Sequence, residues 1–148
     1  IYQTDVRAIQ LAKAALYAGA KLLIDKRGAG MPQRVTLVGA FGNHIDTTYA
    51  MALGLIPDCD LAKVVNGGNS AGTGARIALL NLAARAEIED VVRRIEKVET
   101  AIEPNFQAEF VAAMAFPHAS DPFEHLGQAI KLPERKAAEG GRRRRRSS

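Results

Sequence analysis

The expected fold is decided by the stretch Arg34-Val35-Thr36-Leu37-Val38-Gly39-Ala40-Phe41-Gly42-Asn43-His44-Ile45-Asp46. The apolar run Val35 to Val38 ends abruptly in two glycines, Gly39 and Gly42, and a helical pattern starts near Asp46. This order predicts a buried strand, a tight glycine turn and a helix. Ligands of open α/β sheets bind at such turns, because glycine has no Cβ to keep the backbone away. A single turn of this kind also occurs without a ligand.

A second unit of the same kind follows. Leu61 to Val65 predicts another buried strand, and Asn66-Gly67-Gly68-Asn69-Ser70 predicts a second glycine turn, with Ser70 capping the next helix. Two such units predict an α/β fold with a mostly parallel sheet flanked by helices, in which both turns lie at one edge and can face one ligand. Lys97 to Ile102 is expected to be a third strand.

The chain begins with a long predicted helix, capped by Thr4 and ended by Gly28. Its apolar stripe predicts the core-facing side: Val6, Ile9, Leu16, Ala20 and Leu23. The opposite stripe is polar and consists of Gln10, Lys13, Tyr17 and Lys21. Either this stripe is a solvated face, or it is a polar wall that looks across a cleft.

Four further helices are expected. The first is short, capped by Asp46 and ended by Gly54; two amphipathic helices follow Ser70, with a bend near 83–86; the last begins at Pro104. Their predicted apolar stripes are Ile77, Leu80 and Ala84, then Ile88, Val91, Val92 and Ile95, then Phe106, Phe110 and Met114. Glu89–Arg93 and Asp90–Arg94 are spaced as surface ion pairs.

Composition limits the class of protein. The 148 residues suit one globular domain, without a membrane span or a signal peptide, and the start at Ile1 instead of methionine suggests a processed product or a fragment. The single cysteine, Cys59, excludes an internal disulfide and favours a reducing, cytoplasmic setting. Residues 134–148 are predicted to be disordered. Arg142 to Arg146 carry five positive charges, whereas the net charge of the whole chain is +4, so the other residues sum to −1. A solvated tail is therefore favoured over nucleic-acid binding.

Chemical motifs are few. His44, His118 and His125 show no metal-ligand spacing, and the chain has no nucleophile elbow, zinc-protease motif or P-loop. Cys59 is expected to be inert. We therefore expect no catalytic residue and no metal ligand in this chain, and no activity from the chain alone.

Four motifs in this order resemble one family: Gln3 to Ala15, Leu37 to Asn43, Gly68 to Ala75, and Pro104 to Phe110 with Phe116-Pro117-His118. The family is the ATP-dependent reductive activators of corrinoid proteins, which have an N-terminal [2Fe–2S] ferredoxin-like domain and an ATPase domain of the actin, sugar kinase and Hsp70 class. The resemblance is to their C-terminal part. It covers residues 1–118 as a lobe of the ATPase domain and leaves 119–148 as an extension.

The resemblance implies a ribonuclease-H-like second lobe that contributes the adenosine half of a nucleotide cleft. The residues that it places at ATP are Gly39, Ala40, Phe41, Gly42, Asn43, Gly68 and Asn69, with Gln10 and Lys13 against adenine and ribose. Magnesium would be held mostly by the missing lobe, and the cluster by the missing N-terminal domain. The intact protein would pass an electron to a Co(II) corrinoid protein. A non-catalytic protein-interaction module is the alternative, and the oligomeric state, a homodimer included, stays open.

Overall fold

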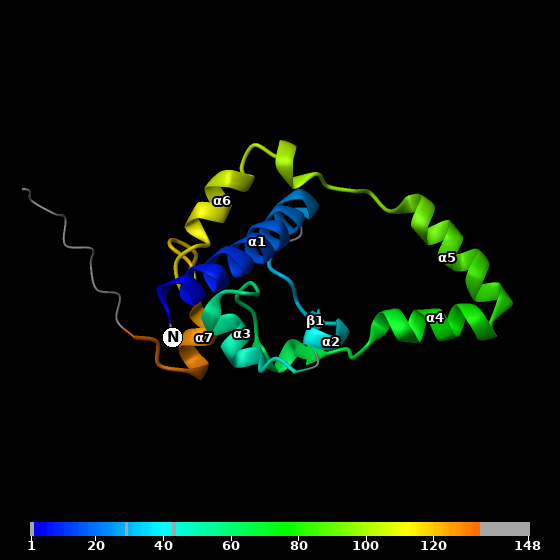
Figure 1. The fold of residues 1–148 in the computed structure, drawn as a ribbon, viewed down its shortest axis with the longest axis horizontal. Helices are drawn as coiled ribbons and strands as arrows, with labels where there is room; N and C mark the ends of the chain where they lie inside the picture. The colour runs from blue at the N-terminus through cyan, green and yellow to red at the C-terminus, as the bar shows by residue number, and fades with distance from the viewer. Residues whose placement is uncertain (1, 29, 43, 134–148) are drawn as a thin grey trace, which may run out of the picture.

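The computed structural model describes residues 2–28, 30–42 and 44–133. Its elements follow in this order: α1 (Gln3–Arg27), β1 (Val35–Leu37), α2 (Gly39–Gly42), α3 (Thr47–Leu53), the 3-10 turn η1 (Leu61–Lys63), β2 (Val64–Asn66), α4 (Ser70–Leu80), α5 (Leu82–Arg94), the 3-10 turn η2 (Thr100–Ile102), α6 (Phe106–Ala112) and α7 (Glu124–Ala129). Figure 1 shows a helical body around α1, from which α4 and α5 project as an arm. No helix in the described part is long and apolar enough to cross a membrane.

A small parallel sheet lies at the base of the arm. β1 and β2 pair in parallel, with Val35 opposite Val64 and Leu37 opposite Asn66. The predicted α/β class with a small parallel sheet is thus confirmed at that level. Both strands are shorter than predicted, and the second is shorter because residues 61–63 form η1. The strands are only half-buried because the core covers one side of the sheet.

The third predicted strand is wrong. Residues 95–99 are extended without a partner strand, Thr100–Ile102 form η2, and Ile102 is 79% exposed. A β-strand requires a neighbour to pair with its N–H and C=O groups. Within the described residues the sheet consists of β1 and β2, and neither strand pairs with this segment.

Helix α1 starts earlier than predicted and ends as predicted. Thr4 lies inside the first turn and does not cap the helix; the carboxylate of Asp5 accepts a hydrogen bond from the N–H of Tyr2 instead. Gly28 closes the helix in the left-handed conformation (φ +63°), which glycine adopts without strain. Lys26 and Arg27 lie in the last turn, where cations are favourable.

The predicted sidedness of α1 is reversed. The residues that pack inward include Lys13, Ala14 and Tyr17, whereas Ile9 and Leu16 of the apolar stripe are exposed. The polar stripe is therefore not a solvated face. It lies against α6 and the segment that follows α6 (Figure 1).

Caps explain the starts of the next helices. The carboxylate of Asp46 accepts hydrogen bonds from the N–H groups of Thr48 and Tyr49, and Gly54 ends α3, both as predicted. The cap of α4 is Asn69 rather than Ser70. Asn81 separates α4 from α5, slightly before the predicted bend, and its side chain accepts from the N–H of Ala84.

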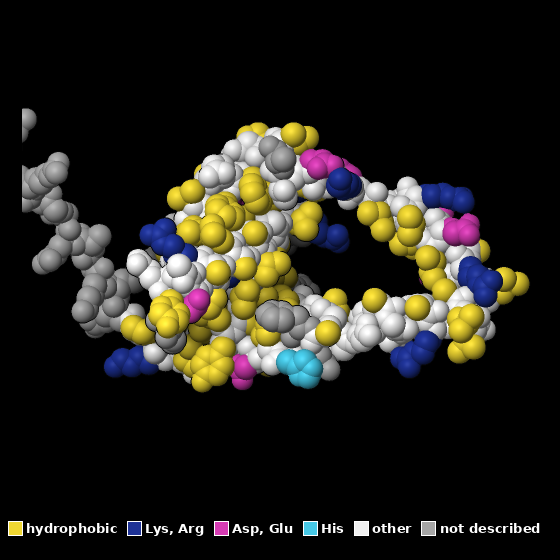
Figure 2. Space-filling view, in the orientation of Figure 1, with side chains coloured by type: hydrophobic (Ala, Val, Ile, Leu, Met, Phe, Trp, Pro, Cys, Tyr) yellow, Lys and Arg dark blue, Asp and Glu magenta, His cyan; other side chains and the backbone are white. Residues whose placement is uncertain are grey.

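The arm formed by α4 and α5 contains no buried residue. The predicted apolar stripes of both helices are therefore uncovered in the described chain, and Leu80 is 83% exposed. Hydrophobic side chains gather along the inner side of the arm in Figure 2, and the predicted pairs Glu89–Arg93 and Asp90–Arg94 are present on its surface.

The core lies between α1, α3, α6 and α7. Its buried members are Ala14, Tyr17, Ala50, Met51, Ile56, Cys59, Val64, Ala113, Phe123 and Leu126. Phe110 and Met114 pack against this cluster as expected, and the rings of Phe106 and Phe110 are 6.0 Å apart. The core continues into residues beyond 118, which the resemblance left as an extension, because Phe123 and Leu126 are buried in it.

Candidate nucleotide-facing edge

The two glycine turns meet at the edge of the sheet where β1 and β2 end. The N–H of Gly39 donates to the carbonyl of Gly68 at 2.8 Å, and the N–H of Gly67 donates to the carbonyl of Leu37 at 2.7 Å. The parallel ladder thus continues past the strands into both turns. The prediction that the turns lie at one end of a parallel sheet is confirmed.

Two of these glycines have conformations that favour glycine and leave open space beside them. Gly39 has φ +93° and Gly68 has φ +64°, and a Cβ built on either would meet no described atom within 4 Å. The positive φ explains why glycine stands there. An atom at either Cβ position would therefore not clash with the described chain.

Gly42 and Gly67 serve packing. A Cβ on the buried Gly42 would lie 3.0 Å from the carbonyl carbon of Leu37, so α2 sits directly on the end of β1. A Cβ on Gly67 would lie 2.8 Å from Cγ2 of Thr36. These two glycines hold the turns against β1, and side chains at either position would push the turns away.

The remaining predicted residues of the turns have different surroundings. Ala40 is exposed on α2. The Oδ1 of Asn69 accepts a hydrogen bond from the N–H of Gly72 at 2.9 Å, so that oxygen fixes the start of α4. Asn43 and the side chain of Phe41 lie outside the described part of the chain.

Gln10 and Lys13 bind main-chain carbonyls after α6. The amide of Gln10 donates to the carbonyl of Met114 at 3.0 Å. The ammonium of Lys13 is completely buried and donates to the carbonyls of Ala115 and Pro117, the latter at 2.7 Å. Their contact with adenosine stays a prediction.

Burial changes the acidity of Lys13. Desolvation of the ammonium lowers the pKa of Lys13 from 10.5 to about 8. The ring of Phe116 lies 5.0 Å from Nζ, a distance at which an aromatic ring attracts a cation. Two carbonyl oxygens and an aromatic ring therefore surround this charge.

The polar stripe continues along α1 toward Asp121. The hydroxyl of Tyr17 donates to Oδ2 of Asp121 at 2.8 Å, and the ammonium of Lys21 reaches the same oxygen at 2.7 Å. Burial would raise the pKa of Asp121, but these hydrogen bonds outweigh it and lower the pKa. Burial alone would lower the pKa of Lys21, but the hydrogen bond to Asp121 outweighs burial, and the pKa of Lys21 is raised.

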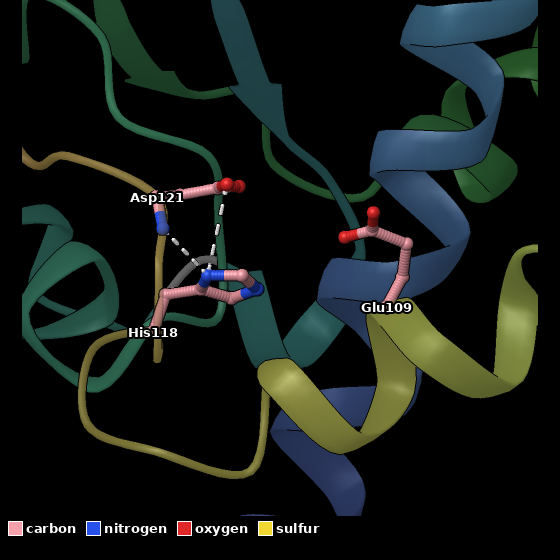
Figure 3. Close-up of side chains that lie close together, drawn as sticks. All are labelled: Glu109, His118 and Asp121. Atoms are coloured by element: carbon pink, nitrogen blue, oxygen red, sulfur yellow. Dashed lines mark hydrogen bonds and ion pairs between the residues drawn. The ribbon is translucent and has the colours of Figure 1, made fainter.

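Glu109, His118 and Asp121 come together between α6 and the loop before α7 (Figure 3). Their potential ligand atoms lie within 4.8 Å of one another, a proximity that the sequence spacing did not predict. Lys21 forms ion pairs with both Glu109 and Asp121. Nδ1 of His118 accepts a hydrogen bond from the N–H of Asp121 at 2.9 Å. The ammonium of Lys21 therefore already pairs with the two carboxylates, and the N–H of Asp121 already uses Nδ1 of the imidazole.

Asp58 and His125 also lie outside the predicted site. The two carboxylate oxygens of Asp58 accept hydrogen bonds from the N–H groups of His125 and Leu126, so this buried carboxylate binds the first turn of α7. Tyr17, Asp58 and Asp121 line a pocket of about 310 Å³, which does not include the glycine turns. No local motif marks these contacts, because each joins residues more than 60 positions apart.

His44 and Cys59 differ in their exposure. His44 is exposed beside the first turn. Cys59 is a buried free thiol whose pKa is raised by burial and by the neighbouring carboxylates of Asp58 and Asp60. A thiol with a raised pKa is a poor nucleophile at neutral pH.

Comparison with known proteins identifies the family. A family model described as the C-terminal domain of RACo, the ASKHA domain, matches residues 1–127. The corrinoid activation enzyme RamQ of Eubacterium limosum is 40% identical over 108 residues, which are 72% of this chain and 18% of RamQ. A solved structure of a reductive activator for corrinoid, iron-sulfur protein is 32% identical with a TM-score of 0.76, over 88% of this chain and 20% of the other.

These matches agree with each other in extent. The chain spans about a fifth of the length of either relative. The family match runs past residue 118, in accordance with the burial of Phe123 and of Leu126 on α7. Since it covers most of the chain, this protein belongs to the family of the C-terminal ASKHA domain of RACo.

Proposed function

We propose that this chain is a lobe of an ATP-dependent reductive activator of corrinoid proteins and contributes the adenosine-facing half of its nucleotide cleft. The observation that carries the proposal is the joined pair of glycine turns at the end of the parallel strands. Gly39 and Gly68 are hydrogen-bonded to each other and leave open space beside their backbones. Such an edge is where α/β sheets bind ligands.

The main chain around Gly39, Ala40 and Gly42, with Gly68 on the second turn, would approach the adenosine. Asn69 would act by fixing the start of α4 through its hydrogen bond to Gly72. Contact by Phe41 and Asn43 is part of the same proposal. Gln10 and Lys13 would contact nucleotide only after releasing their main-chain carbonyls.

Bound Mg-ATP would supply free energy that helps to drive the uphill electron transfer in the complete activator. The phosphate and magnesium contacts would come largely from the rest of the activator. A [2Fe–2S] cluster requires four protein ligands, usually cysteines, and this chain has one cysteine. The cluster and the electron transfer to Co(II) corrinoid would therefore belong to the complete protein.

A substitution at Gly68 tests the proposal. Asparagine tolerates the left-handed conformation, and a side chain at Gly68 would point into open space, so Gly68→Asn should fold normally. We expect the complete gene product to lose at least about tenfold in affinity for ATP, which is about 1.4 kcal/mol, by isothermal titration calorimetry.

Gly74→Ala is the matched control, because Gly74 on α4 also has free space around its Cβ position. This variant should bind ATP as the unsubstituted protein does. Equal ATP affinity in Gly68→Asn and Gly74→Ala would contradict the proposed cradle.

A further inference from the structure

The outward side of α1 carries an apolar face with regular spacing. We define the outer face of α1 as Ile9, Ala12, Leu16, Gly19 and Leu23, which alternate spacings of three and four residues. Ile9, Leu16 and Leu23 are 48%, 58% and 56% exposed. Figure 2 shows hydrophobic side chains gathered over this part of the body.

Such a face is unusual for a helix that already packs on a core. Single exposed hydrophobic residues are normal, but contiguous patches mark interaction surfaces. Here the helix buries Lys13 and Tyr17 while leaving three large aliphatic side chains in a row outside. Spacings of three and four residues place all five positions on one stripe of a helix, the pattern by which helices pack together.

The chemistry of the face defines what can cover it. None of its five residues is charged or polar, so nucleic acid and acidic peptides find no partner group there. Ala12 and Gly19 are small and alternate with the large residues, and a Cβ at Gly19 would meet nothing within 4 Å. Small residues between larger ones let a second helix approach closely, because the distance between helix axes depends on the side chains at the contact.

The length of the relatives indicates where that helix comes from. This chain corresponds to 18% of RamQ and 20% of the solved activator, so about four-fifths of such a polypeptide lie outside the matched part. The described part is also short of a complete core, since exposed large hydrophobic residues outnumber the buried hydrophobic ones. A surface that needs covering and a polypeptide long enough to cover it are thus both indicated.

We propose that the outer face of α1 is an interface within the complete activator, covered by an amphipathic helix from the part of the polypeptide outside the matched fifth. This inference rests on the part of the proposed function that makes the chain one lobe of a longer activator. It does not depend on nucleotide binding, so its test is made without nucleotide.

Thiol labelling tests the interface because Cys59, the one cysteine of the 148 residues, is buried and peptide mass spectrometry reads each thiol separately. Leu16→Cys places a thiol in the centre of the outer face. Arg7→Cys is the control: Arg7 is exposed and, at nine residues from Leu16, lies half a turn away around α1. Alkylation by iodoacetamide is followed at each site by peptide mass spectrometry, in the 148-residue chain and in the complete gene product.

We expect the thiol at position 16 to react as fast as the thiol at position 7 in the 148-residue chain, and at least about tenfold more slowly in the complete protein. Slow reaction of Cys59 reports that the chain is folded. If Cys59 reacts fast in the 148-residue chain, the chain alone is not folded and only the complete protein is used. The thiol at position 16 should then react at least about tenfold more slowly than the thiol at position 7 in the complete protein.

Three results would overturn the proposal. The thiol at position 16 would react as fast in the complete protein as the thiol at position 7. The gene would encode nothing beyond these 148 residues. Alternatively, position 16 would be protected in the chain alone and become reactive on dilution, which would make a second copy the occupant. Loss of ATP binding in a separate titration would leave the labelling result unchanged, so the two proposals fail independently.

Discussion

The main-chain N–H of Gly39 donates a 2.8 Å hydrogen bond to the carbonyl oxygen of Gly68 and so joins two turns that are 29 positions apart in the chain. α2 begins at Gly39 and α4 begins at Ser70, so both helices start next to this bond. The bond therefore links the start of α2 to the start of α4, the first helix of the arm. This coupling makes the edge more than two separate loops.

Gly54 should be intolerant of substitution. Its φ of +72° disfavours any residue with a Cβ, and a Cβ there would lie 2.1 Å from the carbonyl oxygen of Pro117. The same oxygen accepts a hydrogen bond from the ammonium of Lys13. We expect Gly54→Ala to lower the free energy of unfolding by about 3 kcal/mol or more, from strain and overpacking together. Urea unfolding followed by circular dichroism measures this. Gly19→Ala, with free space at its Cβ, should be neutral or stabilising, and equal behaviour of the two variants would contradict the packing described here.

The free energy of unfolding should rise with pH in mild alkali because of Lys13. The pKa of Lys13 is about 8 in the folded state against 10.5 as its ordinary value, so between these pH values the unfolded chain binds more protons. Stability then increases with pH across that window, by at most about 1.4 kcal/mol per pH unit. Below about pH 8 both states are protonated and the dependence vanishes.

The measurement compares unfolding free energies of the unsubstituted chain and Lys13→Met between pH 7 and 10.5. Subtracting the methionine variant removes the contributions of other titrating groups. The difference should shift in favour of the unsubstituted chain as pH rises from 8. A difference that is flat, or that moves against the unsubstituted chain, would show that the ammonium is not held in a desolvating site.

Asp121 should contribute stability that is lost in acid. Its pKa is lowered in the folded state because Lys21 and Tyr17 donate to the carboxylate and outweigh the effect of burial. The contribution is present above the ordinary pKa of 3.8 and disappears as pH falls through the folded value. We expect Asp121→Asn to destabilise by about 1–3 kcal/mol at pH 7 and to match the unsubstituted chain more closely near pH 2. A constant difference across pH 2–6 would argue against these hydrogen bonds.

The arm should open far more easily than the body. α4 and α5 contain no buried residue, whereas α1 contributes five, so local unfolding of the arm exposes little additional apolar surface. In the 148-residue chain, hydrogen exchange should be at least about tenfold less protected in residues 70–94 than in residues 13–22. If both segments exchange at the same rate, the arm is held by contacts that the described residues do not include.

The local parts of the fold were predictable from sequence. Asp46 and the glycines Gly28 and Gly54 act through neighbours only a few residues away, so their patterns predict caps and ends correctly. The parallel pairing of the two turns also followed from repeated strand–turn–helix order. The family could be named from four short motifs, and the comparisons confirm it.

The sidedness of α1 was not predictable from periodicity alone. Hydrophobic periodicity predicts which face is buried only when a helix has one buried face. Here Lys13 and Tyr17 are buried because acceptors more than 100 positions away, Ala115 and Asp121, satisfy them. The outer face is apolar for a different reason, which we propose is a helix from elsewhere in the activator. The third strand failed similarly, since strand pairing depends on a neighbour that the segment itself does not encode.

The central claim is that the joined glycine turns face adenine nucleotide, and glycine-selective NMR tests it most directly. The complete gene product, labelled with ¹⁵N-glycine, is titrated with ADP, and the glycine amides are assigned by substitution. We predict that the amides of Gly39, Gly42 and Gly68 shift on saturation, while those of Gly19 and Gly127, which lie on α1 and α7, stay in place. Saturable ADP binding that leaves all three turn glycines unmoved would contradict the account.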